Sequence, residues 1–188
     1  MGSKATTLEE MDAIVGIPAA SVPKPMKLGI PKEPNPIEED MPQLETLRGK
    51  FELAGKTYGV PVEILAGIAS RESRAGKHLN AEGYDIEKQA YGVMQVDERF
   101  HKRRGTKPDS QAHINQAAEI LAKNKKEIDK KFPKWTEEQR MQAAVAAYNF
   151  GVGNVKSFRH IDRGTTGNDY SKDVISRASA YKSLTSAK

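Results

Sequence analysis

The chain has 188 residues, of which 37% are hydrophobic, and a formal net charge of +5. This length suits one domain with a tail, and no run approaches the roughly 18 apolar residues of a membrane span. The chain contains no cysteine, which excludes a disulfide framework, a thiolate nucleophile and a cysteine zinc site.

The positive charge is unevenly distributed. Residues 1–40 hold four lysines and seven acidic residues, whereas the other 148 residues hold 26 basic and 18 acidic ones, a balance of +8. A basic domain suits a polyanion such as nucleic acid, an anionic membrane or an acidic wall polymer, and charge alone does not choose among them.

The N-terminal part differs from the rest in composition. Seven of the ten prolines fall at or before Pro42. With few apolar anchors, residues 1–40 are predicted to form a proline-rich, largely disordered segment, and residues 41–188 a single domain. The apolar residues 13–15 are interrupted at Gly16, so no hydrophobic core of a signal peptide is visible.

Helical spacing of apolar residues predicts five helices from Gln43 onward. In chain order they carry Leu44, Leu47, Phe51 and Ala54; Leu65 and Ile68; Ile114, Ala117, Ala118, Leu121 and Ile128; Met141, Ala144, Val145 and Tyr148; and Tyr170, Val174, Ala178 and Tyr181. The first ends near Gly59, Pro61 opens the second, and Thr136–Gln139 is a capping box.

Residues 79–97 lack helical spacing. They are predicted to form an irregular lobe with a short hairpin, whose second strand is Tyr91–Asp97. The fold class is therefore α+β, predominantly helical with a small β-hairpin lobe.

One glutamate lies on the wrong side of its predicted helix. Glu72 follows Leu65 and Ile68 by seven and four positions, so it shares their core-facing stripe near the negative end of the helix dipole. Both features should raise the pKa of its carboxyl group. A carboxylic acid that stays protonated near neutral pH can donate a proton to a leaving group. For Glu72 taken alone, an exposed residue just past the helix end is the favoured interpretation, and the features further along the chain reverse that preference.

Two further acids occur in the irregular lobe. Asp97 ends the predicted strand, where Gln95 would share its face, and Asp85 lies earlier in the lobe. A buried acid on a helix end that faces carboxylates on a sheet edge is the arrangement that glycoside hydrolysis requires.

Four ordered motifs resemble the goose-type lysozymes. They are Ile68–Gly76, Tyr91–Asp97, Ala147–Val155 and Gly164–Tyr170, and the resemblance extends from about Gln43 to Leu184. The pattern is similar to that of a cysteine-free, fish-like vertebrate member. The resemblance implies a lysozyme-like fold and inverting cleavage of the β-1,4 bond between N-acetylmuramic acid and N-acetylglucosamine in peptidoglycan. It also implies a bacteriolytic, antimicrobial role.

The resemblance also assigns site residues. Glu72 matches the general acid, and Asp97 and Asp85 match acids that position or activate water. The positions that match or adjoin sugar contacts are Gln95, His101, Ile120, Tyr148, Asn149 and Tyr170.

Several residues also have structural interpretations. Tyr148 has the spacing of a core residue, and Asn149 could cap its helix before Gly151. Trp135 is interpreted as the anchor of a satellite core. His78, His113 and His160 show no metal-ligand spacing, so no metal or cofactor is expected.

Two alternatives stay open at this point. A lytic transglycosylase would use the same acid without a second carboxylate, and a catalytically silent module would only bind wall polymer or nucleic acid. The acids at 85 and 97 favour hydrolysis over transglycosylation, and Glu72 argues against a silent module because a buried acid is costly without a role. We therefore expect a monomer that acts on peptidoglycan and not on nucleic acid. Such an enzyme is expected outside cells or in a phagocytic compartment, with cytoplasmic storage as a further option because no signal peptide is visible.

Overall fold

The computed structural model describes residues 36–85 and 89–187. The predicted disordered segment, residues 1–40, lies mostly outside these residues. Where the two overlap the predicted boundary is wrong, because α2 (Pro36–Tyr58), the first helix of the described residues, begins at Pro36 and continues through Pro42. Ile37 and Asp40 are fully buried, and these two anchors outweigh the prolines that suggested a tail.

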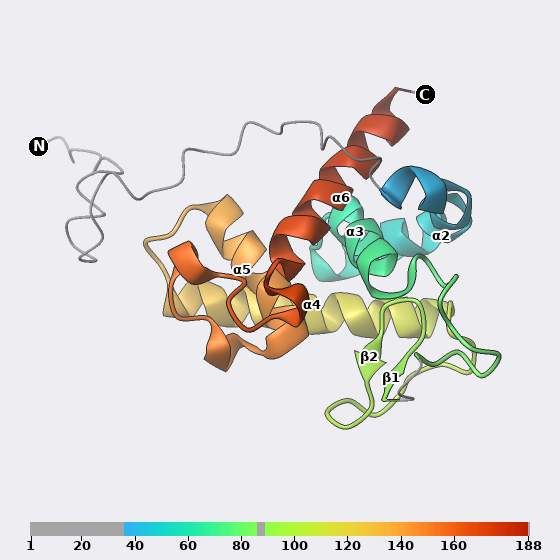
Figure 1. The fold of residues 1–188 in the computed structure, drawn as a ribbon, viewed down its shortest axis with the longest axis horizontal. Helices are drawn as coiled ribbons and strands as arrows, with labels where there is room; N and C mark the ends of the chain where they lie inside the picture. Colours follow the sequence, from blue (N-terminus) through green and yellow to red (C-terminus); the bar gives the residue numbers. More distant parts are fainter. Residues whose placement is uncertain (1–35, 86–88, 188) are drawn as a thin grey trace, which may run out of the picture.

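Two helices form the centre of the molecule. Helix α3 (Val62–Ser73) packs most extensively on α6 (Tyr170–Ser186), and α2 packs on α3. Gly67 permits the close approach of α3 and α6, since a Cβ atom there would lie 2.7 Å from the carbonyl oxygen of Val174. Figure 1 shows α6 passing beside α3, with the β lobe at the lower edge of the view.

The remaining helices confirm the predicted order. Helix α4 (Gln111–Lys131) ends before Pro133, and α5 (Glu137–Phe150) begins with the predicted capping box at Thr136 and Gln139. Three short 3-10 turns, η2 (Val152–Asn154), η3 (Phe158–His160) and η4 (Thr166–Asn168), connect α5 to α6.

Two hydrophobic clusters hold these elements together. The larger takes residues from all five α-helices of the described chain and from the hairpin, and it includes Leu65 and Ile68, both fully buried. The smaller one joins α4 and α5 around Ile128. Trp135 stacks on Phe132 at its edge with ring centroids 3.9 Å apart, which confirms that Trp135 anchors a satellite core.

The hairpin differs from its prediction. Its strands are β1 (Ala90–Tyr91) and β2 (Val96–Asp97), which pair antiparallel, so residues 92–95 form the turn between them. A single strand over Tyr91–Asp97 is therefore wrong. Gly92 has φ +76° and Gln95 has φ +47°, and these left-handed conformations reverse the chain where a regular strand would continue.

Candidate active site

Glu72 is the penultimate residue of α3 and lies on its buried side. The helix ends directly after it, because Arg74 adopts a left-handed conformation with φ 52° and caps the last carbonyl groups. Tyr170, the first residue of α6, donates a hydrogen bond from its hydroxyl to Oε1 of Glu72. The close packing of α3 on α6 therefore fixes the position of the carboxyl group.

The surroundings of Glu72 favour its protonated form. The residue keeps some surface accessible, but protein surrounds the carboxyl group, and burial raises its pKa from 4.5 to about 7. The hydrogen bond from Tyr170 and the charge of Arg71 lower this pKa, whereas the charge of Asp85 raises it. Glu72 can thus hold a proton near neutral pH, as its place on the apolar stripe predicted.

Two buried phenols adjoin Glu72. Tyr148 of α5 donates a hydrogen bond of 2.8 Å to the carbonyl oxygen of Met94 in the hairpin turn. Burial raises the pKa of both Tyr148 and Tyr170, and the charge of Glu72 raises it further. Both groups therefore act as hydrogen-bond donors, and Tyr170, only 1% exposed, contacts the carboxyl group through its hydroxyl.

The two aspartates occupy different environments. Asp97 in β2 forms a bidentate ion pair with Arg99, whose Nε and Nη2 donate hydrogen bonds of 3.0 Å and 2.6 Å to the carboxylate. These bonds hold the pKa of Asp97 below its ordinary value. Asp85 accepts a hydrogen bond of 3.1 Å from the backbone N–H of Gln89. It is the aspartate whose charge raises the pKa of Glu72.

The other predicted site residues are spread around this centre. Gln95 lies in the hairpin turn, where its amide donates to the carbonyl oxygen of Gly92. His101 is exposed, beside a hollow lined by residues 98–103. Ile120 packs against the main core, and Asn149 binds the 3-10 turn η4 through the backbone N–H of Thr166.

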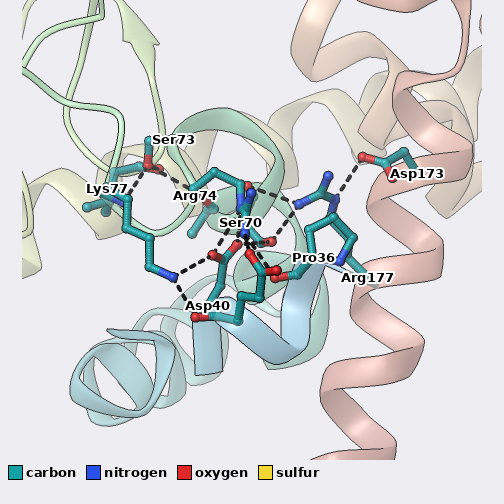
Figure 2. Close-up of polar contacts among 12 residues, drawn as sticks. Pro36, Asp40, Ser70, Ser73, Arg74, Lys77, Asp173 and Arg177 are labelled. Atoms are coloured by element: carbon teal, nitrogen blue, oxygen red, sulfur yellow. Dashed lines mark hydrogen bonds and ion pairs between the residues drawn. The ribbon is translucent and has the colours of Figure 1, made fainter. Parts of the chain in front are cut away.

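A buried ionic cluster that the sequence analysis missed supports the C-terminal end of α3, the end that carries Glu72 (Figure 2). Asp40 is fully buried and accepts hydrogen bonds from Ser70 at 2.7 Å, from Arg74 at 2.9 Å and from Lys77 at 3.2 Å. Burial alone would raise the pKa of Asp40, but these bonds outweigh it and hold the pKa below its ordinary value. The available signal was the same as for Glu72, since Asp40 lies four positions before Leu44 on the apolar stripe of α2.

The cluster continues to α6. Arg177 donates to Oγ of Ser70 at 2.8 Å and to Asp173 at 2.8 Å (Figure 2). Arg71 bonds the same carboxylate at 2.8 Å and Asp169 at 3.0 Å. Ion pairs and hydrogen bonds therefore tie residues on both sides of Glu72 to α2 and α6.

The described part of the chain contains no group of three or more His, Cys, Asp or Glu residues arranged to hold a metal ion. Within the same part, none of the helices has the length and apolar character needed to cross a membrane.

The raised pKa of Glu72 predicts a pH-dependent stability difference. The folded state binds this proton more tightly than the unfolded state, so its contribution to stability is present below pH 4.5 and is lost as the pH rises through about 7. The Glu72→Gln variant has no titrating carboxyl group at this position, so its stability does not fall in this pH range for this reason. Urea unfolding followed by Trp135 fluorescence should show the variant gaining about 2–3 kcal/mol relative to wild type between pH 4.5 and pH 8. A difference that stays constant between the two pH values would contradict the raised pKa.

Comparison with known proteins shows which family this chain resembles. The family model described as Lysozyme g matches residues 28–185. Lysozyme g of Casuarius casuarius is 40% identical over 162 residues, covering 85% of this chain and 86% of the relative. Lysozyme g of Cyprinus carpio is 39% identical over 181 residues, covering 96% and 90%, and that of Epinephelus coioides is 43% identical over 152 residues, covering 76% and 78%. The chain belongs to the lysozyme g family.

Proposed function

We propose that this lysozyme hydrolyses the β-1,4 bond between N-acetylmuramic acid and N-acetylglucosamine in peptidoglycan, with inversion at the anomeric carbon. The observation that carries the proposal is the carboxyl group of Glu72, whose pKa burial raises to about 7. Proton donation to a glycosidic oxygen near neutral pH requires such a group.

In this mechanism Glu72 protonates the oxygen that leaves. Tyr170 holds the carboxyl group in place through its hydrogen bond to Oε1. Asp85 and Asp97 hold a water molecule that attacks the anomeric carbon from the opposite face, and one of these carboxylates accepts the proton that the water loses as the new bond forms. An inverting site leaves room for that water, so the acid and the water-binding carboxyl groups should lie about 6.5–9.5 Å apart with substrate bound.

The other predicted site residues complete the proposed binding site for the sugar chain. Gln95, His101, Ile120 and Asn149 would contact the sugar chain around the cleavage point. The Tyr148 hydroxyl already bonds Met94, and the Tyr170 hydroxyl already bonds Glu72. We therefore propose that both residues contact the sugars through their rings, that the Tyr170 hydroxyl orders the acid, and that Tyr148 is held near it by its bond to Met94.

Product analysis tests the reaction. Purified peptidoglycan digested with the enzyme should yield reducing N-acetylmuramic acid ends by mass spectrometry, and proton NMR of the fresh digest should show the α-anomer. A parallel digest with Glu72→Gln gives the background. Anhydro-muramyl ends would indicate transglycosylation, and initial release of the β-anomer would contradict inversion.

A further inference from the structure

His113 is a buried titratable residue that the proposed mechanism does not use. It lies in the first turn of α4 with none of its surface exposed. Its Nε2 accepts a hydrogen bond of 3.1 Å from the backbone N–H of Met94 in the hairpin turn. The carbonyl oxygen of Met94 accepts a hydrogen bond of 2.8 Å from the hydroxyl of Tyr148. Met94 is therefore held at both of its backbone polar groups, from α4 on one side and from α5 on the other.

The turn is shaped around the imidazole ring. A Cβ atom at position 92 would lie 2.4 Å from Nε2 of His113, so only glycine lets the turn approach the ring so closely. The turn is also held from α3, because Oγ of Ser73 donates to the carbonyl oxygen of Val93 at 2.9 Å. Left-handed backbone at Gln95, with φ +47°, persists where surrounding contacts impose it.

His113 is suited to accept a hydrogen bond at Nε2. Burial lowers its pKa to about 4, although the charge of Asp109 opposes this shift, so the ring is neutral at pH values near 7. A neutral ring that accepts at Nε2 carries its hydrogen on Nδ1. Nδ1 is buried and has no hydrogen-bond partner within residues 36–85 and 89–187. The ring therefore makes its hydrogen bond to Met94 through Nε2, while Nδ1 is left without one.

We propose that His113 is a positioning residue of the active site, which fixes the Met94 backbone and through it the hydroxyl of Tyr148 beside Glu72. Tyr148 lies close enough for the charge of Glu72 to affect it. Loss of the acceptor at Nε2 frees the Met94 N–H and lets the turn shift, which displaces the carbonyl group that orients Tyr148. This inference rests on the proposed function, because it concerns the alignment of the same acid.

Two substitutions separate hydrogen bonding from packing. His113→Leu fills the space but removes the acceptor, whereas His113→Gln can present Oε1 to the Met94 N–H. On soluble peptidoglycan fragments, His113→Leu should lower kcat by about tenfold, the factor that corresponds to one net hydrogen bond. KM should stay within about twofold, and His113→Gln should keep most of the wild-type kcat. Equal losses in both variants, or no loss in His113→Leu, would overturn the proposal.

A double-mutant cycle tests the route through Met94. If His113 acts on Tyr148, the His113→Leu/Tyr148→Phe variant should be no slower than the slower single variant. Losses in kcat that multiply would show that the two residues act separately. Far-UV circular dichroism and Trp135 fluorescence confirm that each variant folds.

The tautomer of the His113 ring can be measured directly in the wild-type protein. Nitrogen-15 NMR of the histidine rings at pH 7 should show His113 with hydrogen on Nδ1 and an unprotonated Nε2. The opposite tautomer would overturn the proposal, because Nε2 could not accept from Met94. The digest with wild-type enzyme tells the two proposals apart. If the proposed function itself is wrong, this digest lacks new reducing ends, whatever the His113 variants do.

Discussion

Glu72→Gln should slow the lysis of a Gram-positive cell-wall suspension by about 10²–10⁴-fold, the usual contribution of a general acid. The glutamine side chain has the same shape, and its Oε1 can still accept the hydroxyl of Tyr170, which bonds Oε1 of Glu72 in the wild type. The amide, however, has no acidic proton to give to the glycosidic oxygen. Turbidity of the suspension at pH 6–7 measures the effect.

A peptidoglycan-binding assay and a matched control variant distinguish loss of catalysis from loss of affinity for the wall. Sedimentation with insoluble peptidoglycan should recover Glu72→Gln as fully as wild type, because the substitution leaves the remaining site in place. Glu63→Gln changes a glutamate in the first turn of the same helix, where Glu63 pairs with Lys182 at the surface, and should lyse normally. A Glu72→Gln variant that lyses as well as the parent would remove Glu72 from the mechanism.

Asp85→Asn should change the pH profile of lysis as well as its rate. The charge of Asp85 raises the pKa of Glu72, so its removal lets Glu72 ionise at lower pH. The alkaline limb of the profile, which reports loss of the protonated acid, should therefore move to lower pH. Loss of the water-binding carboxylate should also reduce the maximal rate by about 10²-fold.

Asp97→Asn is the matched control for Asp85→Asn. This carboxylate pairs with Arg99, and it is not among the groups whose charge shifts the pKa of Glu72. The substitution should reduce the rate but leave the alkaline limb where it is in the wild type. Profiles that shift equally in both variants would contradict the assignment of Asp85 as the aspartate that influences the acid. An unchanged rate in either variant would remove that residue from the water site.

The position of the acid could be predicted because it depends on local periodicity. Leu65 and Ile68 define the buried stripe of α3, and any residue four positions after Ile68 must lie on it. The same reasoning located α4 and α6, whose apolar residues repeat regularly, and the capping box at Thr136. These features need only neighbours within one or two helical turns.

Other parts of the site depend on contacts between distant segments. The turn at residues 92–95 requires positive φ at Gln95 as well as at Gly92, and glutamine gives no local sign of that conformation. The bond from Tyr170 to Glu72 joins residues 98 positions apart, and it exists only because α3 packs on α6. Spacing along the chain likewise could not show that Asp97 pairs with Arg99 while Asp85 influences the acid.

The buried anion of α2 also constrains how this protein can change during evolution. Asp40 balances the cations of Arg74 and Lys77 directly behind the helix that carries the acid. Loss of the aspartate alone would remove the carboxylate that pairs with both cations, leaving Lys77 and the partly buried Arg74 beside the vacated position. Residues 40, 74 and 77 should therefore be inherited together, and an alignment of relatives in which they vary independently would show that the balance is dispensable.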